Sequence, residues 1–224
     1  MERVVNIGRR LQGLGGALSA EAWDTLIRAG AARSYAVGEV LMRQGEAGTY
    51  VLCLTSGRIK VTRSESDGSE LLLAVRGPGE VVGAIAVIDG GPRSATVMAL
   101  QRCVAYALPA TRFRSIVDSY RLTDRLIRHV VERLREGEDL RSELAQLSAK
   151  CRVVAALLRF AACDGSATQV VEISQDELAG AIGLSRAAVA AELSELRQAG
   201  LVATGRRRLE VLDAIALRRI LVDR

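Results

Sequence analysis

The spacing of hydrophobic and polar positions changes twice along the 224-residue chain. Residues 1–34 have a helical pattern, and Ser19 is placed to cap a helix within ALSAEAWDTLIRAGAAR. The apolar positions that mark one face of this helix are Leu18, Ala22, Leu26 and Ile27. We therefore expect a helical lead-in ahead of the first change in pattern.

Residues 35–108 alternate between apolar and polar positions in short runs, which turn signals separate. The runs are EVLMRQ, TYVLCLTSG, RIKVTRS, ELLLAVR, EVVGAIAV, SATVMAL and CVAYALP. Gly, Asp-Gly or Pro-Gly interrupts them, and Asp67-Gly68 is typical of a hairpin turn. Short strands at spacings of about 8 to 12 residues predict a β-sandwich or barrel.

From about Thr111 to Leu147 the pattern becomes helical again, and from about residue 119 it is unusually long. At about 1.5 Å per residue, this stretch would reach roughly 40 Å. Its apolar positions recur every three or four residues, interrupted by Gly137: Leu126, Val130, Leu134, Leu140, Leu144 and Leu147. That spacing is typical of a two-stranded coiled coil, so we favour a homodimer with these residues at its interface. The alternative is a helix that lies on its own domain.

Residues 148–224 predict a second domain of short helices, with a net charge of only +2. Within it, Ser174 can cap a helix, and Glu177 follows at the spacing of a capping box. Gly183 then ends that helix, and Ser185 can cap a second one. A helix, a short glycine-containing turn and a helix in this order predict a helix-turn-helix.

The second helix of this motif would enter the major groove of DNA by its N-terminal end. Arg186 stands there and can form two hydrogen bonds with a guanine edge, while Ser185 can reach a phosphate. After it, LVATGRRRLEVLD predicts two short strands around a wing tip. The wing arginines expected to contact phosphates or a minor groove are Arg206, Arg207 and Arg208. The alternative is a generic helical hairpin with a basic turn.

Net charge and the cysteine and histidine content limit which partners and cofactors the protein is expected to have. The net charge of +5 permits a polyanionic partner without requiring one. The cysteines (Cys53, Cys103, Cys151 and Cys163) form no C-x-x-C pair, and the single histidine, His129, does not lie at ligand spacing from any of them. We therefore expect reduced cysteines, a cytoplasmic protein, and no metal site, iron–sulfur cluster or haem. Neither a signal peptide nor a membrane span is visible.

No nucleophile and base stand at catalytic spacing, so we do not expect an enzyme. His129 lies on the long helix, where we expect a surface or interface residue, and Cys103 is expected to pack within a strand.

The stretch GEVVGAIAVIDGGPRSATV, residues 79–97, has the pattern of a phosphate cradle. Glycines allow close backbone approach, and Arg93 with Ser94 offers a cation beside a hydroxyl. Ala84 stands where a carboxylate would be needed to hold a sugar hydroxyl. A second interpretation is that Arg93 only closes the barrel or pairs with Glu80.

Three segments together resemble the CRP/FNR (catabolite activator protein type) family of bacterial transcription regulators: residues 38–61, 79–96 and 173–189. The resemblance implies an α+β chain with a jelly-roll-like β-roll of the cyclic-nucleotide-binding type, a long dimerisation helix and a C-terminal winged helix-turn-helix. We place these at residues 1–110, 111–147 and 148–224. The resemblance implies a homodimeric, sequence-specific transcription regulator, with a palindromic DNA operator and RNA polymerase as partners. The alternative is a ligand-binding module that acts through protein partners and binds DNA weakly.

The resemblance also implies a ligand site at Gly83, Ala84, Ile85, Arg93, Ser94 and Ala95. Ala84 replaces the family's ribose-binding glutamate, and Gly137 and Glu138 replace two hydroxyl residues that contact adenine. Losing one charged and two neutral hydrogen bonds would weaken cyclic AMP binding by about three orders of magnitude or more. Glu138 could instead accept from a base amino group, so a cyclic nucleotide or other phosphate-bearing ligand, a different small ligand, and no ligand all remain open.

In the recognition helix, family members that read a TGTGA-type half-site resemble R-E-x-x-x-R, of which only Arg186 is present here. A different or looser operator is therefore expected, with Ala187 or Ala191 against a thymine methyl group. Ser174 and Gln175, at the start of the first helix of the motif, complete the expected DNA contacts.

Overall fold

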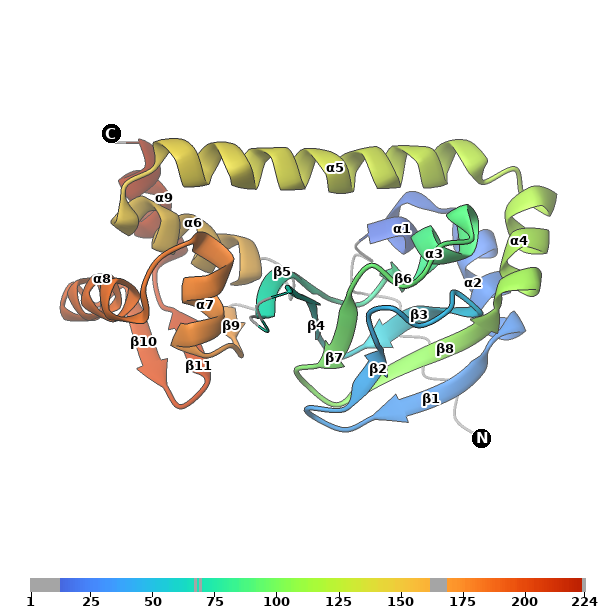
Figure 1. Ribbon diagram of the computed structural model, residues 1–224, viewed down its shortest axis with the longest axis horizontal. Coiled ribbons are helices and arrows are strands. Elements are labelled where there is room, and N and C mark those ends of the chain that lie inside the picture. The colour runs from blue at the N-terminus through green and yellow to red at the C-terminus, as the bar shows by residue number, and fades with distance from the viewer. Residues whose placement is uncertain (1–12, 67, 69, 162–168, 223–224) are drawn as a thin grey trace.

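The structure is a computed structural model, which describes residues 13–66, 68, 70–161 and 169–222. Part of the expected lead-in, Asp67 of the expected hairpin turn, and Cys163 lie outside these residues. A β-roll occupies one end of the molecule and a smaller helical domain the other, and one long helix, α5 (Thr123–Gln146), runs along both (Figure 1). No helix in the described ranges has the length and apolarity of a membrane span.

The lead-in is only partly helical. Helices α1 (Gly13–Ala17) and α2 (Ala20–Ala29) precede the roll, and the Ser19 side chain accepts a hydrogen bond from Ala22 N–H at 3.3 Å, as predicted. The extension of the helical stretch to residue 34 is wrong, because β1 (Ala31–Tyr35) begins directly after Gly30. Each of its residues pairs with β8 (Cys103–Pro109), a partner far along the chain.

The roll consists of two four-stranded antiparallel sheets, with strand orders β1-β8-β3-β6 and β2-β7-β4-β5. Its remaining strands are β2 (Val40–Met42), β3 (Tyr50–Ser56), β4 (Ile59–Ser64), β5 (Glu70–Arg76), β6 (Val81–Val82) and β7 (Thr96–Ala99). Two clusters of buried apolar side chains form its core. The predicted α+β fold is confirmed.

The run EVVGAIAV does not form a single strand. After two residues of β6, Gly83 adopts a left-handed conformation (φ +83°), which redirects the chain into α3 (Ala84–Asp89). This conformation strains residues that carry a side chain, so glycine is favoured at this point. The expectation of a strand here is wrong because local alternation does not show where the chain turns.

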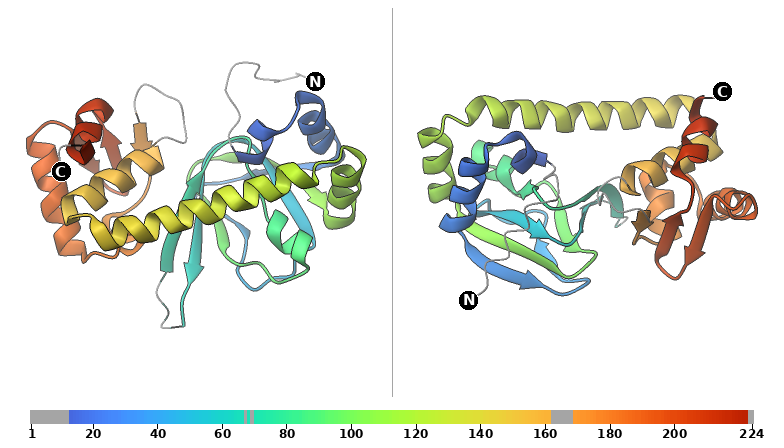
Figure 2. Two further views of the ribbon diagram at one scale, coloured as in Figure 1. Left: turned by 90° about the horizontal axis from the view of Figure 1, so that it is seen from above. Right: turned by 180° about the vertical axis from the view of Figure 1, so that it is seen from behind.

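The long helical stretch is also divided. Helix α4 (Ala110–Ser119) ends before α5 begins, and Arg121 between them has a positive φ of +50°. The 24 residues of α5 span about 36 Å at about 1.5 Å per residue. Seen from above, α5 crosses over the roll and reaches the helical domain (Figure 2).

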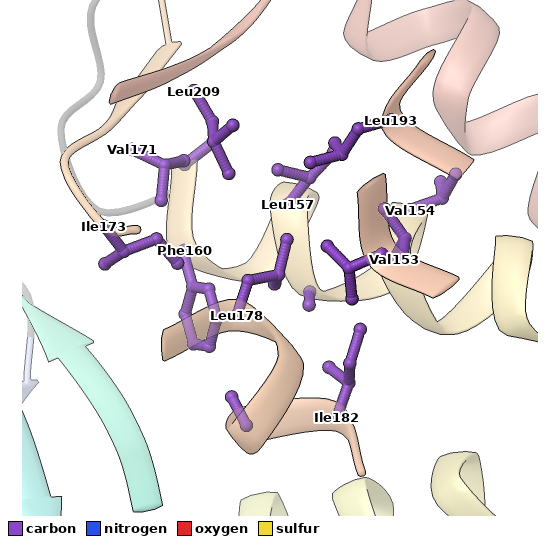
Figure 3. Packing of buried hydrophobic residues seen from close by; sticks show 14 of the residues in the cluster. Val153, Val154, Leu157, Phe160, Val171, Ile173, Leu178, Ile182, Leu193 and Leu209 are labelled. Carbon is purple, nitrogen blue, oxygen red and sulfur yellow. The ribbon is translucent and has the colours of Figure 1, made fainter. Parts of the chain in front are cut away.

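The C-terminal domain contains α6 (Ala149–Ala161), α7 (Gln175–Ile182), α8 (Arg186–Gln198) and α9 (Ala214–Val222). A three-stranded sheet with order β10-β11-β9 completes it: β9 (Gln169–Val171), β10 (Val202–Gly205) and β11 (Arg208–Val211). Strand β9 was not predicted. Figure 3 shows the core of this domain, where Leu157 and Phe160 of α6 lie among side chains from α7, α8 and the sheet.

Candidate functional site

Hydrogen bonds between close neighbours in sequence form the turn between α7 and α8. The Ser174 hydroxyl accepts from Glu177 N–H at 3.1 Å, and Glu177 Oε2 accepts from Ser174 N–H at 2.7 Å, which completes the predicted capping box. Gly183 ends α7 with φ +62°, and the Ser185 hydroxyl accepts from Ala188 N–H at 3.2 Å. Both helices therefore begin, and α7 ends, as the sequence predicts.

Helix α8 exposes the face that carries the predicted base contacts. The Arg186 side chain is 72% exposed in its first turn, and Ala187 and Ala191 are exposed beside it. The opposite face, with Val189 and Leu193, packs in the domain core. Arg186 Nε lies 3.5 Å from Asp176 Oδ1, and this exposed pair is a weak interaction that a phosphate or base can replace.

The wing has a tip of two residues, Arg206 and Arg207, because Gly205 pairs with Arg208 across the strands. Arg207 has a positive φ of +53°, and its guanidinium lies 3.3 Å from Glu177 Oε2. Arg208 pairs with Glu210 at 2.6 Å. Ser174 and Gln175, half-buried at the start of α7, lie on the same side as the wing, since Glu177 contacts it.

A cavity of about 620 Å³ lies between the roll and α5. Seven of the eight predicted ligand residues line it: Gly83, Ala84, Ile85, Arg93, Ser94, Ala95 and Gly137. The eighth, Glu138, is exposed on α5 and is not among the lining residues. Ala84 is only 6% exposed and packs in the roll core, so position 84 offers no carboxylate to a ligand.

The Arg93 guanidinium is bound to the roll itself. It donates to Gly83 O at 2.8 Å and to Tyr50 O, and it lies 5.0 Å from the centre of the Tyr50 ring. Burial lowers the pKa of Arg93, although Tyr50 and Glu46 oppose this. Two N–H donors of this guanidinium therefore hold the roll, and a guanidinium carries further donors that can face the cavity, which Arg93 lines.

Glu80 pairs with Arg133 and His129 of α5, and not with Arg93. Its carboxylate lies 2.7 Å from Arg133 Nη2 and 3.3 Å from His129 Nε2. Burial would raise the pKa of the Glu80 carboxyl, but the hydrogen bond with His129 and the charges of Arg133 and Arg76 lower it. His129 is not a surface residue of this chain, contrary to that part of the expectation, because its 8% exposed side chain packs against Glu80.

The six apolar residues predicted for the dimer interface, Val130 and five leucines, differ in burial within this chain. Leu126 packs in the roll core, Leu147 is buried, and Leu144 packs against the C-terminal cluster. Val130 and Leu140 are half-buried. Leu134 alone of the six is strongly exposed, at 63%.

The side chains that accompany Leu134 are Ile127 and Val131, which the sequence analysis missed. Their i, i+4, i+7 spacing with Leu134 is a signal in the sequence, and it marks a stripe that meets the predicted one at Leu134.

The roll contacts the C-terminal domain through apolar and polar side chains, and Leu72 and Val75 of β5 belong to the same buried cluster as the core of that domain. Lys60 of β4 forms an ion pair with Glu177, and the 2% exposed Arg58 donates to Phe160 O and Val170 O. Burial would raise the pKa of Glu177, but hydrogen bonds from Lys60 and Ser174 lower it. The carboxylate of the capping box therefore also joins the two domains.

The cysteines do not form a ligand cluster in the part of the chain that the structure describes. Cys103 is buried in β8, as expected of a packed strand residue, and burial raises the pKa of Cys53 to about 12. Among residues 13–66, 68, 70–161 and 169–222, no group of three or more His, Cys, Asp or Glu side chains is placed to hold a metal ion.

Comparison with known families agrees with both halves of this architecture. Residues 32–120 match the cyclic nucleotide-binding domain family, and residues 151–220 match the Crp-like helix-turn-helix domain family. The chain is 31% identical over 190 residues to a cyclic AMP receptor protein of Thermus thermophilus, which covers 84% of this chain and 87% of that one. It is 29% identical over 169 residues to a CRP-like cAMP-activated global transcriptional regulator of Mycobacterium tuberculosis, covering 73% and 75%.

Solved structures have the same fold. A CRP-family transcriptional regulator from Thermus thermophilus superposes with a TM-score of 0.69 and 26% identity, and covers 84% of this chain and 95% of that one. A global regulator of Xanthomonas campestris superposes with a TM-score of 0.72 at 21% identity, and covers 87% and 100%. The roll, the long helix and the helix-turn-helix, together with these matches, show that the chain belongs to the CRP/FNR family of transcriptional regulators.

Proposed function

We propose that the chain is a homodimeric, sequence-specific DNA-binding regulator that uses the N-terminal end of α8 to read the major groove. The observation that carries this is the exposed first turn of α8, where Arg186 projects from a helix that Ser185 caps. A helix end in this setting can contact phosphates through its free N–H groups and a guanine through its arginine. RNA polymerase is proposed as a further partner.

The dimer is proposed to form through the exposed apolar face of α5. Ile127, Val131 and Leu134 are exposed there, and Ile85 and Ile88 of α3 are exposed as well. An apolar groove of about 470 Å³, lined by Ile88, Ile127 and Val131 among others, lies along the same helix. A second copy related by two-fold symmetry would cover these side chains with the same face of its own helix.

Leu134→Glu tests the dimer, because it would place a charge in the proposed interface. Sedimentation should then show a monomer, whereas Arg135→Glu, at an exposed position on the same helix, should leave the dimer intact. A dimer that survives Leu134→Glu would place the interface elsewhere.

DNA recognition is tested by selecting duplexes from a random library with the full-length protein. We expect an enriched palindrome, with half-sites about one helical turn apart. Arg186→Ala should cost about 1–3 kcal/mol of binding free energy and relax the preference at one base position. The control is Arg197→Ala, at the other end of α8 and also exposed. Equal effects of the two substitutions, or no enriched sequence, would refute the proposed groove contact.

The cavity is proposed to bind cyclic AMP weakly or not at all. Ala84 supplies no carboxylate, and Arg93 is already bound to two carbonyl groups. Because two relatives are named for cyclic AMP, that nucleotide is the first to test, followed by cyclic GMP and cyclic dinucleotides. Calorimetric titration of the apo protein should show no binding in the micromolar range, and micromolar binding of cyclic AMP would refute the proposal.

A further inference from the structure

Four charged side chains connect the roll to α5 along the wall of the cavity. Arg76 stands at the end of β5 and Glu80 just before β6, while Arg133 and Glu136 lie one turn apart on α5. All four line the cavity. We call them the ion chain.

The distances in the ion chain are those of charge-assisted hydrogen bonds. Arg76 Nη2 lies 2.6 Å from Glu136 Oε2, and Glu136 Oε1 lies 2.7 Å from Arg133 Nη1. Arg133 Nη2 then contacts both oxygens of Glu80, at 2.7 and 3.0 Å. Arg133 uses two nitrogens of its planar guanidinium to hold two carboxylates, a geometry that favours arginine over lysine.

The Glu80 end of the ion chain is buried, so its ion pairs contribute more to stability than a surface salt bridge does. Glu80 is almost completely enclosed, and His129 donates to it as a third contact from α5. When a buried carboxylate loses its partner, no interaction offsets the free-energy cost of removing its charge from water. The folded roll therefore strongly favours the arrangement in which α5 lies where Arg133 can reach Glu80.

The same wall holds the groups that a charged ligand would need. Arg93 is bound to the carbonyl groups of Gly83 and Tyr50, and Arg76 and Arg133 are bound to carboxylates. A ligand that joins the roll to α5 through polar contacts would compete with these bonds or share the arginines with them. The protein's own side chains already make that connection.

We propose that the ion chain holds α5 on the roll without any ligand, so that the affinity of the protein for DNA is independent of cyclic nucleotides. The first half, that the ion chain holds α5 on the roll, is argued from the contacts above. The second half, that DNA affinity is independent of cyclic nucleotides, rests on the proposed function, since it requires that the protein binds DNA. The competing interpretation is that the ion chain stabilises the roll without influencing DNA binding.

The experiment uses the full-length protein and the duplex selected from the random library. Hydrogen exchange of peptides covering residues 126–140 reports whether α5 stays on the roll, and fluorescence anisotropy reports DNA affinity. Glu136→Gln is the main variant, because Glu136 is about half exposed and Arg133 keeps its pair with Glu80, while the 20% exposed Arg76 loses its charged partner. Arg133→Gln is the stronger variant, and Glu138→Gln, exposed on the same helix, is the control.

We expect faster exchange in both ion-chain variants and a loss of DNA affinity of about tenfold, or roughly 1.4 kcal/mol, with no change in the control. DNA affinity of the wild-type protein should be the same with and without cyclic AMP or cyclic GMP.

Exchange rates like those of the control would overturn the first half of the proposal. Faster exchange with unchanged DNA affinity, or a wild-type affinity that rises with a cyclic nucleotide, would overturn the second half. A wild-type protein that selects no duplex would refute the proposed function together with that second half, while the exchange rates would still decide the first.

Discussion

Two glycines flank α3, and replacing each with alanine should have different costs. Both adopt left-handed conformations, with φ +83° at Gly83 and +74° at Gly90. A Cβ at Gly83 would lie 2.3 Å from Arg93 Nη1 and 2.9 Å from the end of Met42, whereas a Cβ at Gly90 meets no described heavy atom within 4 Å. Gly90→Ala therefore carries the backbone strain alone, and Gly83→Ala carries the strain and displaces Arg93.

The magnitudes follow from these contacts. A left-handed conformation costs a residue with a side chain about 1–2 kcal/mol, and both variants should lose this much free energy of unfolding. Displacing Arg93 breaks its hydrogen bond to Gly83 O, and a bond made by a charged donor is worth about 1.5–3 kcal/mol. Gly83→Ala should therefore lose about 1.5–3 kcal/mol more than Gly90→Ala.

Urea unfolding followed by tryptophan fluorescence measures both losses. Trp23 is the only tryptophan, and it is buried in the roll core, so its emission reports on the domain that contains both glycines. In an Arg93→Met background the two alanine variants should become nearly equal. Equal losses in the wild-type background would refute the inference that Arg93 occupies the space beside Gly83, and a difference that persists without Arg93 would assign the clash to Met42.

Three further predictions concern the charges and thiols. The pKa of Glu80 is lower in the folded chain than in the unfolded one, so the stability that its ionised carboxylate gives the fold is complete above about pH 4.3 and is lost as the pH falls further. Urea midpoints measured against pH should show this loss, and Glu80→Gln should reduce it. Arg206→Ala at the wing tip should lower the slope of log K against log salt by about 1 without changing the selected sequence, and an unchanged slope would exclude a phosphate contact. Cys53, whose pKa burial raises to about 12, should react with a thiol reagent at pH 8 only after unfolding, whereas the partly exposed Cys151 should react in the native protein; modification of native Cys53 would contradict its burial.

Features that depend on neighbours along the chain were predictable from the residues alone. Ser19, Ser174 and Ser185 cap helices by hydrogen bonds to residues three positions ahead, so each helix start was predicted correctly. The wing follows from the same kind of information, because Gly205 and Arg208 are only three positions apart. The Ala84 replacement was also visible, since it depends on residue type within a short motif.

The partner of each polar group and the face that each helix buries depend on the three-dimensional packing of distant segments. Strand β1 forms because β8 lies beside it, and Glu80 finds Arg133 and His129 because α5 crosses the roll. The same crossing buries Leu126 and leaves Ile127 and Leu134 exposed. These contacts join segments far apart in sequence, and their energies depend on the position of the whole helix. A periodic pattern shows that a helix has an apolar stripe, but the fold decides which stripe faces its own core and which remains for a partner.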